Sequence, residues 1–155
     1  MGSYSRVMTD THTMVVLSVS DCWDLLAGTA LGRLVTTVDG VPAIFPVNYT
    51  VQDRTVLFRT AQGTKLVSAA INNNVLFEAD GYSLSEGWSV IVAGVARSVR
   101  SEEDIAEAER AGLISWTDSE KEHFVRIHPR GVTGRRFRFR AQPGTGTPAE
   151  DPILG

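Results

Sequence analysis

The feature that most limits the possible folds is a succession of short strand-like runs in the first half of the chain. A run at residues 32–38 is joined to a second run at 41–51 by Asp39-Gly40, a strong signal for a two-residue hairpin turn. A third run at 55–60 follows another turn at 52–54. All three runs are rich in β-branched and aromatic residues, which favour strands. The chain therefore begins as an antiparallel meander.

The rest of the chain adds further strands and covering helices. We predict helices starting at Ser18 or Ser20, over residues 63–74, and from Ser101, where a capping-box pattern occurs. Pro42 and Pro46 indicate an edge or a bulge in the second strand, because proline donates no ladder hydrogen bond. More strands are predicted at residues 75–79, 88–99 (with Gly94 as a bulge or close approach), 124–127 and 132–139. This order favours a mainly β fold, an antiparallel barrel with a few helices.

Length and composition indicate a single globular unit. The 155 residues can bury one hydrophobic core. We expect one domain over residues 13–140, after a mobile arm at 1–12 and before a disordered tail at 141–155. The sequence shows no secretory signal and no apolar run long enough to cross a bilayer. We therefore expect a cytoplasmic protein with no membrane partner.

The segment with the clearest chemistry is residues 56–65. A strand ends there in Arg59-Thr60, and after a turn containing Gly63 a helix opens at Thr64-Lys65. Two cationic side chains, two hydroxyls and the first N–H groups of a helix suit a phosphate. The same residues are also compatible with solvated surface charges and a helix cap. Both interpretations stay open on spacing alone.

A second basic segment lies at residues 126–140, where six arginines are interleaved with Phe137 and Phe139. Such a pattern can bind single-stranded nucleic acid. It is also typical of a strand with Phe inward and Arg outward at a solvated or subunit edge. The net charge of −3 favours the strand and argues against a nucleic-acid partner. A third interpretation is that some arginines reach anionic groups of a cofactor or substrate across a dimer interface.

Other catalytic signatures are missing from the sequence. There is no glycine-rich dinucleotide or Walker motif. The single cysteine, Cys22, lies on a predicted amphipathic helix, where packing is its expected role. His12, His123 and His128 lack zinc-ligand spacing, so we expect no metal site. No catalytic residue is identified.

Four motifs taken together resemble a known family. They are Gly32-Arg33-Leu34, Pro46-Val47-Asn48-Tyr49, Phe58-Arg59-Thr60 with Gly63-Thr64-Lys65, and Gly87-Trp88-Ser89-Val90 with Gly94. In order and spacing they resemble the pyridoxamine 5′-phosphate oxidase-like proteins, the FMN-binding split-barrel group, over about residues 20–140. The resemblance implies a six-stranded antiparallel split barrel and a homodimer with two flavin sites between its subunits.

The same resemblance implies which residues hold the cofactor. Arg59, Thr60, Thr64 and Lys65 would bind the FMN phosphate. The backbone of Pro46, Val47 and Asn48 would lie along the isoalloxazine ring. Trp88 and Ser89 would come from the long strand beside the flavin, across the subunit interface. A dimer would also cover the apolar face that we expect Trp88, Val90 and Val92 to form.

The likeness does not extend to the substrate motif. Pyridoxamine phosphate oxidases carry a C-terminal motif with arginine and histidine, which residues 127–137 do not match. We therefore expect an FMN-dependent oxidoreductase acting on another small molecule. The alternatives are a reductase that uses the deazaflavin F420, whose acidic tail the arginines of 126–140 would neutralise, and a non-enzymatic protein that binds flavin or haem.

Overall fold

The computed structural model describes residues 14–61, 65–113 and 122–139. The arm predicted at 1–12 and the tail predicted at 141–155 lie outside these ranges. The described elements are β1 (Met14–Val16), α2 (Val19–Ala27), β2 (Leu31–Val38), β3 (Val41–Gln52), β4 (Thr55–Ala61), α3 (Lys65–Ala70), β5 (Asn74–Tyr82), β6 (Glu86–Ser98), α4 (Glu102–Arg110) and β7 (Glu122–Arg138). None of these helices is long and apolar enough to cross a membrane.

Six of the strands close into an antiparallel barrel in the order β7-β4-β3-β2-β5-β6, and β6 pairs back with β7. This confirms the predicted six-stranded split barrel. The strand β1 is an additional strand that pairs with β7 outside the barrel, at Met14↔Phe137 through Val16↔Arg135. Its three residues are too few to show a periodic pattern in the sequence.

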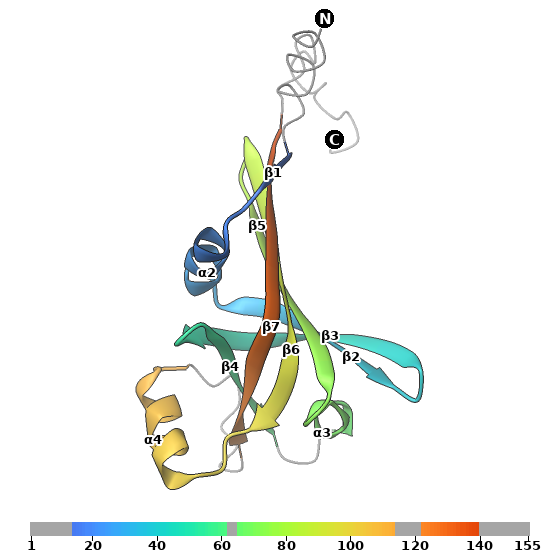
Figure 1. The fold of residues 1–155 in the computed structure, drawn as a ribbon, viewed down its shortest axis with the longest axis vertical. Helices are drawn as coiled ribbons and strands as arrows, with labels where there is room; N and C mark the ends of the chain where they lie inside the picture. Colours follow the sequence, from blue (N-terminus) through green and yellow to red (C-terminus); the bar gives the residue numbers. More distant parts are fainter. Residues whose placement is uncertain (1–13, 62–64, 114–121, 140–155) are drawn as a thin grey trace, which may run out of the picture.

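The last strand organises the molecule. β7 pairs with β4 over residues 122–127, with β1 over 135–137 and with β6 along nearly its whole length. In Figure 1, β5, β6 and β7 extend together beyond the part of the barrel formed by β2, β3 and β4. We predicted two strands, at 124–127 and 132–139, where the structure has one. The prediction was wrong because the continuous ladder with β6 keeps Pro129 and the neighbouring glycines extended.

A bulge in β7, where Arg130 has no partner on β6, accommodates this long pairing. The register between β6 and β7 shifts between Ala93 and Gly94. A Cβ atom added to Gly94 would lie 2.3 Å from the carbonyl oxygen of His128, so no larger residue fits without movement of the backbone. Of the two expectations for this glycine, the close approach is confirmed, whereas the bulged residue lies opposite it on β7.

The helices begin largely where the capping residues predict. Ser18 precedes α2 and its hydroxyl accepts a hydrogen bond from the Asp21 N–H, and Ser101 does the same for the Asp104 N–H at α4. The helix predicted over 63–74 is shorter, because α3 covers only Lys65–Ala70. Asn72, with φ of +65°, takes the left-handed conformation soon after that helix ends.

The hydrophobic core fills the barrel and the space under α2. Leu34, Phe58 and Phe77 are fully buried there, as are Val90 and Val92. The prediction that Val90 and Val92 form an exposed face was therefore wrong. Alternation along β6 points the even-numbered residues inward and leaves Ile91 on the outer face.

The outer half of β7 also differs from expectation. Phe137 and Phe139, predicted to point inward, are exposed by 37% and 51%. The cause is the packing of α2 against this strand, because a Cβ atom on Gly134 would lie 2.5 Å from the sulfur of Cys22. Gly134 therefore fixes which residues of β7 face the core, and Phe137 lies on the opposite face.

Candidate functional site

The barrel opens where β3 and β4 part. These strands pair only from Gln52↔Thr55 to Tyr49↔Phe58. Beyond that point β3 continues along β2, while β4 continues along β7 as far as Ala61. The first residues past the division, which we call the fork, are Asn48 on β3 and Arg59 on β4. The fork thus brings together two groups of predicted cofactor residues, Pro46–Asn48 and Arg59-Thr60.

The β3 side of the fork presents backbone. The Tyr49 N–H donates to the Ala30 carbonyl, 2.9 Å away on the β2 side. Backbone groups alternate between the two edges of a strand, so the N–H and C=O of Asn48 point to the edge that β4 has left. Val47 is 8% exposed and its side chain lies in the core. The backbone N–H and C=O of Val47 point toward β2, like those of Tyr49 two residues away, and Val47 pairs there with Gly32. The backbone contact that the family resemblance implies therefore falls to Pro46 and Asn48 at the fork.

The β4 side of the fork presents charge and hydroxyl groups. The Arg59 guanidinium carbon lies 4.6 Å from the centre of the Phe124 ring on β7, a cation–π contact that holds the side chain near the end of the strand. Thr60 lies opposite His123. Neighbouring residues of a strand face opposite ways, so Arg59 and Thr60 approach the strand end from its two faces.

His123 was not singled out for this place by the sequence. Its ring is half-buried, and its Nδ1 atom is buried with no hydrogen-bond partner. The residues one step back along each strand on the same face, Phe58 and Val125, are fully buried in the barrel. The cross-strand register that puts His123 beside Thr60 has no counterpart in local sequence spacing, which is why the sequence did not reveal it.

The third basic residue belongs to α3. Lys65 is the first residue of this helix and is exposed, and Thr64 lies outside the described residues. Val67 and Ala70 of α3 pack into the barrel core. Because only three residues separate Ala61 from Lys65, this packing keeps the start of α3 near the end of β4. The chain between residues 55 and 65 contains no carboxylate, so its fixed charge is purely positive.

Trp88 and Ser89 lie far from this cluster in the same chain. Trp88 is opposite Arg136 on β7, whereas Arg59 is opposite Phe124. These positions are twelve residues apart along one strand, or about 40 Å at a rise of about 3.3 Å per residue. Figure 1 shows β7 running nearly straight over this length. The predicted cofactor residues therefore form two separate groups within one chain.

The two residues of this second group also face opposite ways. Trp88 packs against the core cluster, and a Cβ atom on Gly81 would lie 2.6 Å from its Nε1 atom. Ser89 lies on the outer face of the sheet, which it shares with Pro46, Asn48 and Ile91. Trp88 and Ser89 therefore cannot line one surface together.

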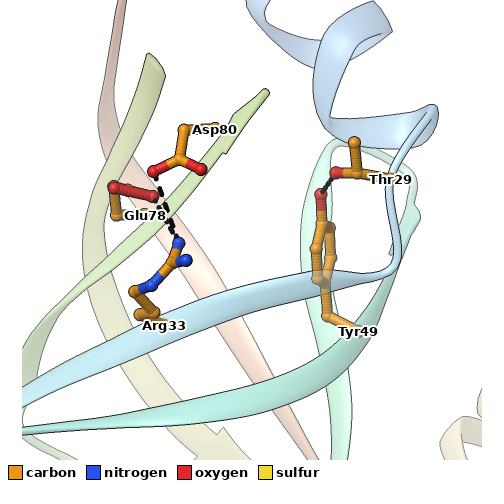
Figure 2. Close-up of polar contacts among 5 residues, drawn as sticks. All are labelled: Thr29, Arg33, Tyr49, Glu78 and Asp80. Carbon is orange, nitrogen blue, oxygen red and sulfur yellow. Dashed lines mark hydrogen bonds and ion pairs between the residues drawn. The ribbon is translucent and has the colours of Figure 1, made fainter. Parts of the chain in front are cut away.

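An ion-pair cluster crosses that outer face. The Arg33 guanidinium lies 3.1 Å from a Glu78 oxygen and 3.4 Å from an Asp80 oxygen, as Figure 2 shows. Burial, together with the neighbouring Asp80, raises the pKa of Glu78 despite the opposing effect of Arg33. Exposed apolar side chains surround the cluster, with Leu31, Ile44, Leu76 and Ile91 between 41% and 63% exposed.

Cys22 plays the packing role predicted for it. The side chain is fully buried in the core cluster. Burial raises the pKa of its thiol, and Asp21 raises it further. The group therefore stays protonated at neutral pH, and a buried thiol is a poor nucleophile.

The groups at the fork fit a phosphate-bearing planar ligand. Arg59 and Lys65 supply positive charge, Thr60 supplies a hydroxyl, and His123 carries a buried nitrogen with no partner. The backbone edge of β3 supplies donors and acceptors for a flat polar ring. This combination of charge, donors and a strand edge is what a mononucleotide-type ligand requires.

Comparison with known proteins finds similar sequences and structures over most of the chain. A family model described as pyridoxamine 5′-phosphate oxidase matches residues 18–136. The solved structure of an FAD-binding protein from Mycobacterium smegmatis is 65% identical, with 81% of this chain and 100% of that chain covered and a TM-score of 0.77. A conserved protein of unknown function from Corynebacterium diphtheriae is 38% identical, with 80% and 98% covered and a TM-score of 0.70. An uncharacterised protein of Mycobacterium tuberculosis is 52% identical over 93 residues, which are 60% of this chain and 84% of that protein.

Proposed function

This chain belongs to the pyridoxamine 5′-phosphate oxidase family, and from that premise we propose that it is a flavin-binding oxidoreductase whose cofactor lies at the fork between β3 and β4. The observation that carries the proposal is the division of the two strands after Tyr49↔Phe58. It leaves a backbone edge on one side, which suits the flavin ring, and Arg59-Thr60 on the other, which suits the phosphate.

The residues of the chain would bind and orient the cofactor. Arg59 and Lys65 neutralise the phosphate, with Thr60 as a hydrogen-bond donor. The backbone of Pro46 and Asn48 aligns the edge of the ring. A bound flavin supplies the hydride or electron transfer itself. No side chain at the fork is assigned as a catalytic acid or base.

We propose FMN as the simplest cofactor that these groups can hold. The similar protein from Mycobacterium smegmatis is named for FAD, and FAD contains the same riboflavin phosphate unit. F420 also carries a phosphate. The charged cluster at Arg59 and Lys65 favours all three over riboflavin, so the choice among them depends on contacts beyond the phosphate.

We also propose that the active unit is a homodimer in the cytoplasm. A flavin mononucleotide with its phosphate at Arg59 cannot extend along about 40 Å of β7 to the Trp88 of the same chain. A second copy would have to bring that strand to the cofactor. The exposed apolar side chains around Arg33 on the outer face give such a copy a surface to bury.

The substrate is proposed only as a class. Residues 127–137 differ from the substrate motif of pyridoxamine phosphate oxidases, and all of them lie inside β7, where all but Arg130 pair with β6. We therefore propose a small organic oxidant or reductant other than pyridoxamine phosphate. A screen of reductant-coupled turnover with the reconstituted protein tests this part of the proposal.

Cofactor titration tests the site directly. FMN, FAD and F420 are added separately to the purified protein, and the dissociation constants are measured by fluorescence. We expect Arg59→Ala and Lys65→Ala each to weaken FMN binding about tenfold or more, because each removes a charged hydrogen bond. Arg54→Gln, in the exposed turn that joins β3 to β4 at the opposite end of β4 from Arg59, serves as the control. Unchanged affinity in both fork variants would overturn the phosphate site.

A further inference from the structure

We propose that His123 is an additional ligand of the cofactor phosphate and that it donates through its Nε2–H group. The proposal rests on the proposed function, because it concerns the same site. It adds a residue that neither the sequence motifs nor the family resemblance indicates.

The position of His123 is set by the pairing of β4 with β7. Thr60 and His123 are directly opposite each other in this ladder, one pair from its end at Ala61↔Glu122. Directly opposite residues have Cβ atoms about 4.5–5.5 Å apart. The two side chains also share a face, because Phe58 and Val125 of the preceding pair on that face are both in the barrel core. An anion bound by the Thr60 hydroxyl therefore lies within reach of the imidazole.

The surroundings of the ring determine which nitrogen carries the proton. Nδ1 is buried and has no hydrogen-bond partner. A buried N–H without an acceptor is costly, and an unpaired acceptor is tolerated somewhat better. The neutral ring therefore keeps its proton on Nε2. Since the ring is only half-buried, Nε2 is the nitrogen that can face a ligand.

The same arrangement fixes which nitrogen a ligand would meet. A ring whose Nδ1 is buried and whose Nε2–H is accessible presents a single hydrogen-bond donor in a fixed direction. Such a donor suits a phosphate oxygen, which accepts but does not donate.

Two substitutions test the roles of the two ring nitrogens separately. In His123→Gln the amide nitrogen can occupy a place close to that of Nε2, whereas in His123→Asn it lies close to that of Nδ1. Each variant is titrated with FMN and with riboflavin, which lacks the phosphate. We expect His123→Asn to weaken FMN binding about tenfold and His123→Gln to stay within about threefold of the original protein. Riboflavin affinity should be the same in all three proteins.

The outcomes distinguish this inference from the proposed function. If the original protein binds FMN and Lys65→Ala weakens it, but His123→Asn does not, the role of His123 is overturned while the site stands. If His123→Asn loses FMN and riboflavin equally, His123 is a structural residue and the inference also fails. If the original protein binds no flavin, the proposed function itself is wrong.

A measurement on the unsubstituted protein guards against misfolded variants. Nitrogen NMR of protein labelled at histidine reports the protonation of each ring nitrogen. We expect His123 to show a protonated Nε2 and a bare Nδ1, and the Nε2 signal to move on addition of FMN but not of riboflavin. A proton on Nδ1 of the neutral ring, or no response to FMN, would contradict the assignment.

Discussion

At the scale of single residues, Tyr49 ties the fork to the helix above it. Its hydroxyl donates to the Leu26 carbonyl at the end of α2, 2.7 Å away, and contacts the Thr29 hydroxyl, a pair that Figure 2 shows. Its ring packs edge-on against Phe77. Burial raises the pKa of the Tyr49 hydroxyl, although Thr29 opposes this effect. The group therefore remains a hydrogen-bond donor over the whole physiological range.

We expect Tyr49→Phe to lower the free energy of unfolding by about 1–2 kcal/mol, because the buried Leu26 carbonyl loses its donor. Denaturant unfolding of the two proteins measures the difference. Tyr82→Phe is the matched control, since the Tyr82 side chain is 89% exposed and its loss of a hydroxyl should have no effect. Equal stability of Tyr49→Phe and the original protein would show that the hydrogen bond contributes nothing net.

Residue identity alone predicted part of the site. The Arg59-Thr60 strand end and the basic start of α3 could be read from the order of residue types, because strand, turn and helix signals lie within ten residues of each other. The roles of Phe124 beside Arg59 and of His123 beside Thr60 could not be predicted. Those contacts join residues more than sixty positions apart, and only the ladder register brings them together.

At the scale of elements, local signals worked where capping or a turn decides the structure. Ser18 and Ser101 start their helices, and Asp39-Gly40 closes its hairpin with φ of +51° and +78°. Local sequence signals failed where a strand forms because an adjacent strand pairs with it. β7 remains one strand through Pro129 and Gly131 because β6 pairs with it on both sides of the bulge. The three-residue β1 exists because β7 offers an edge.

The bulge opposite Gly94 gives the sharpest test at this scale. We expect Gly94→Ala to lower the free energy of unfolding by about 1–3 kcal/mol, as overpacking does, because the new methyl group would meet the His128 carbonyl. Gly131→Ala is the matched control on the partner strand, where a Cβ atom has nothing within 4 Å. Thermal unfolding compares the two variants. If they melt together, close approach at Gly94 does not determine the bulge.

At the scale of the whole molecule, the described residues form an apolar outer face around Arg33 with exposed side chains. Ile91 lies in it between Glu78 on β5 and Thr133 on β7. From the sequence we expected Trp88, Val90 and Val92 to form the apolar face, whereas Ile91 is the exposed residue. The sequence does not show which of the two alternating rows of β6 side chains points inward. Only the packing of the inner row against Phe77 and Leu34 settles that choice.

We expect Ile91→Lys to convert the proposed dimer into a monomer of 16.8 kDa and to weaken flavin binding with it, because a lysine on this face would have to be desolvated in the interface. Light scattering and FMN titration at the same protein concentration measure both effects. Ala106→Lys, at an exposed position of α4, should change neither. A dimer that survives Ile91→Lys with full affinity would place the interface elsewhere.

The role of β7 as the strand that closes the barrel has a consequence for biosynthesis. Its partners β4 and β6 are made earlier, but until residues 122–138 have left the ribosome, one edge of β4 has no neighbour and Arg59 lacks the Phe124 ring beneath it. The nascent chain thus carries an open sheet edge from the synthesis of β4 until that of β7, the state in which strands pair with the wrong chain most readily. Ligand capture at the fork must therefore wait until residues 122–138 have emerged.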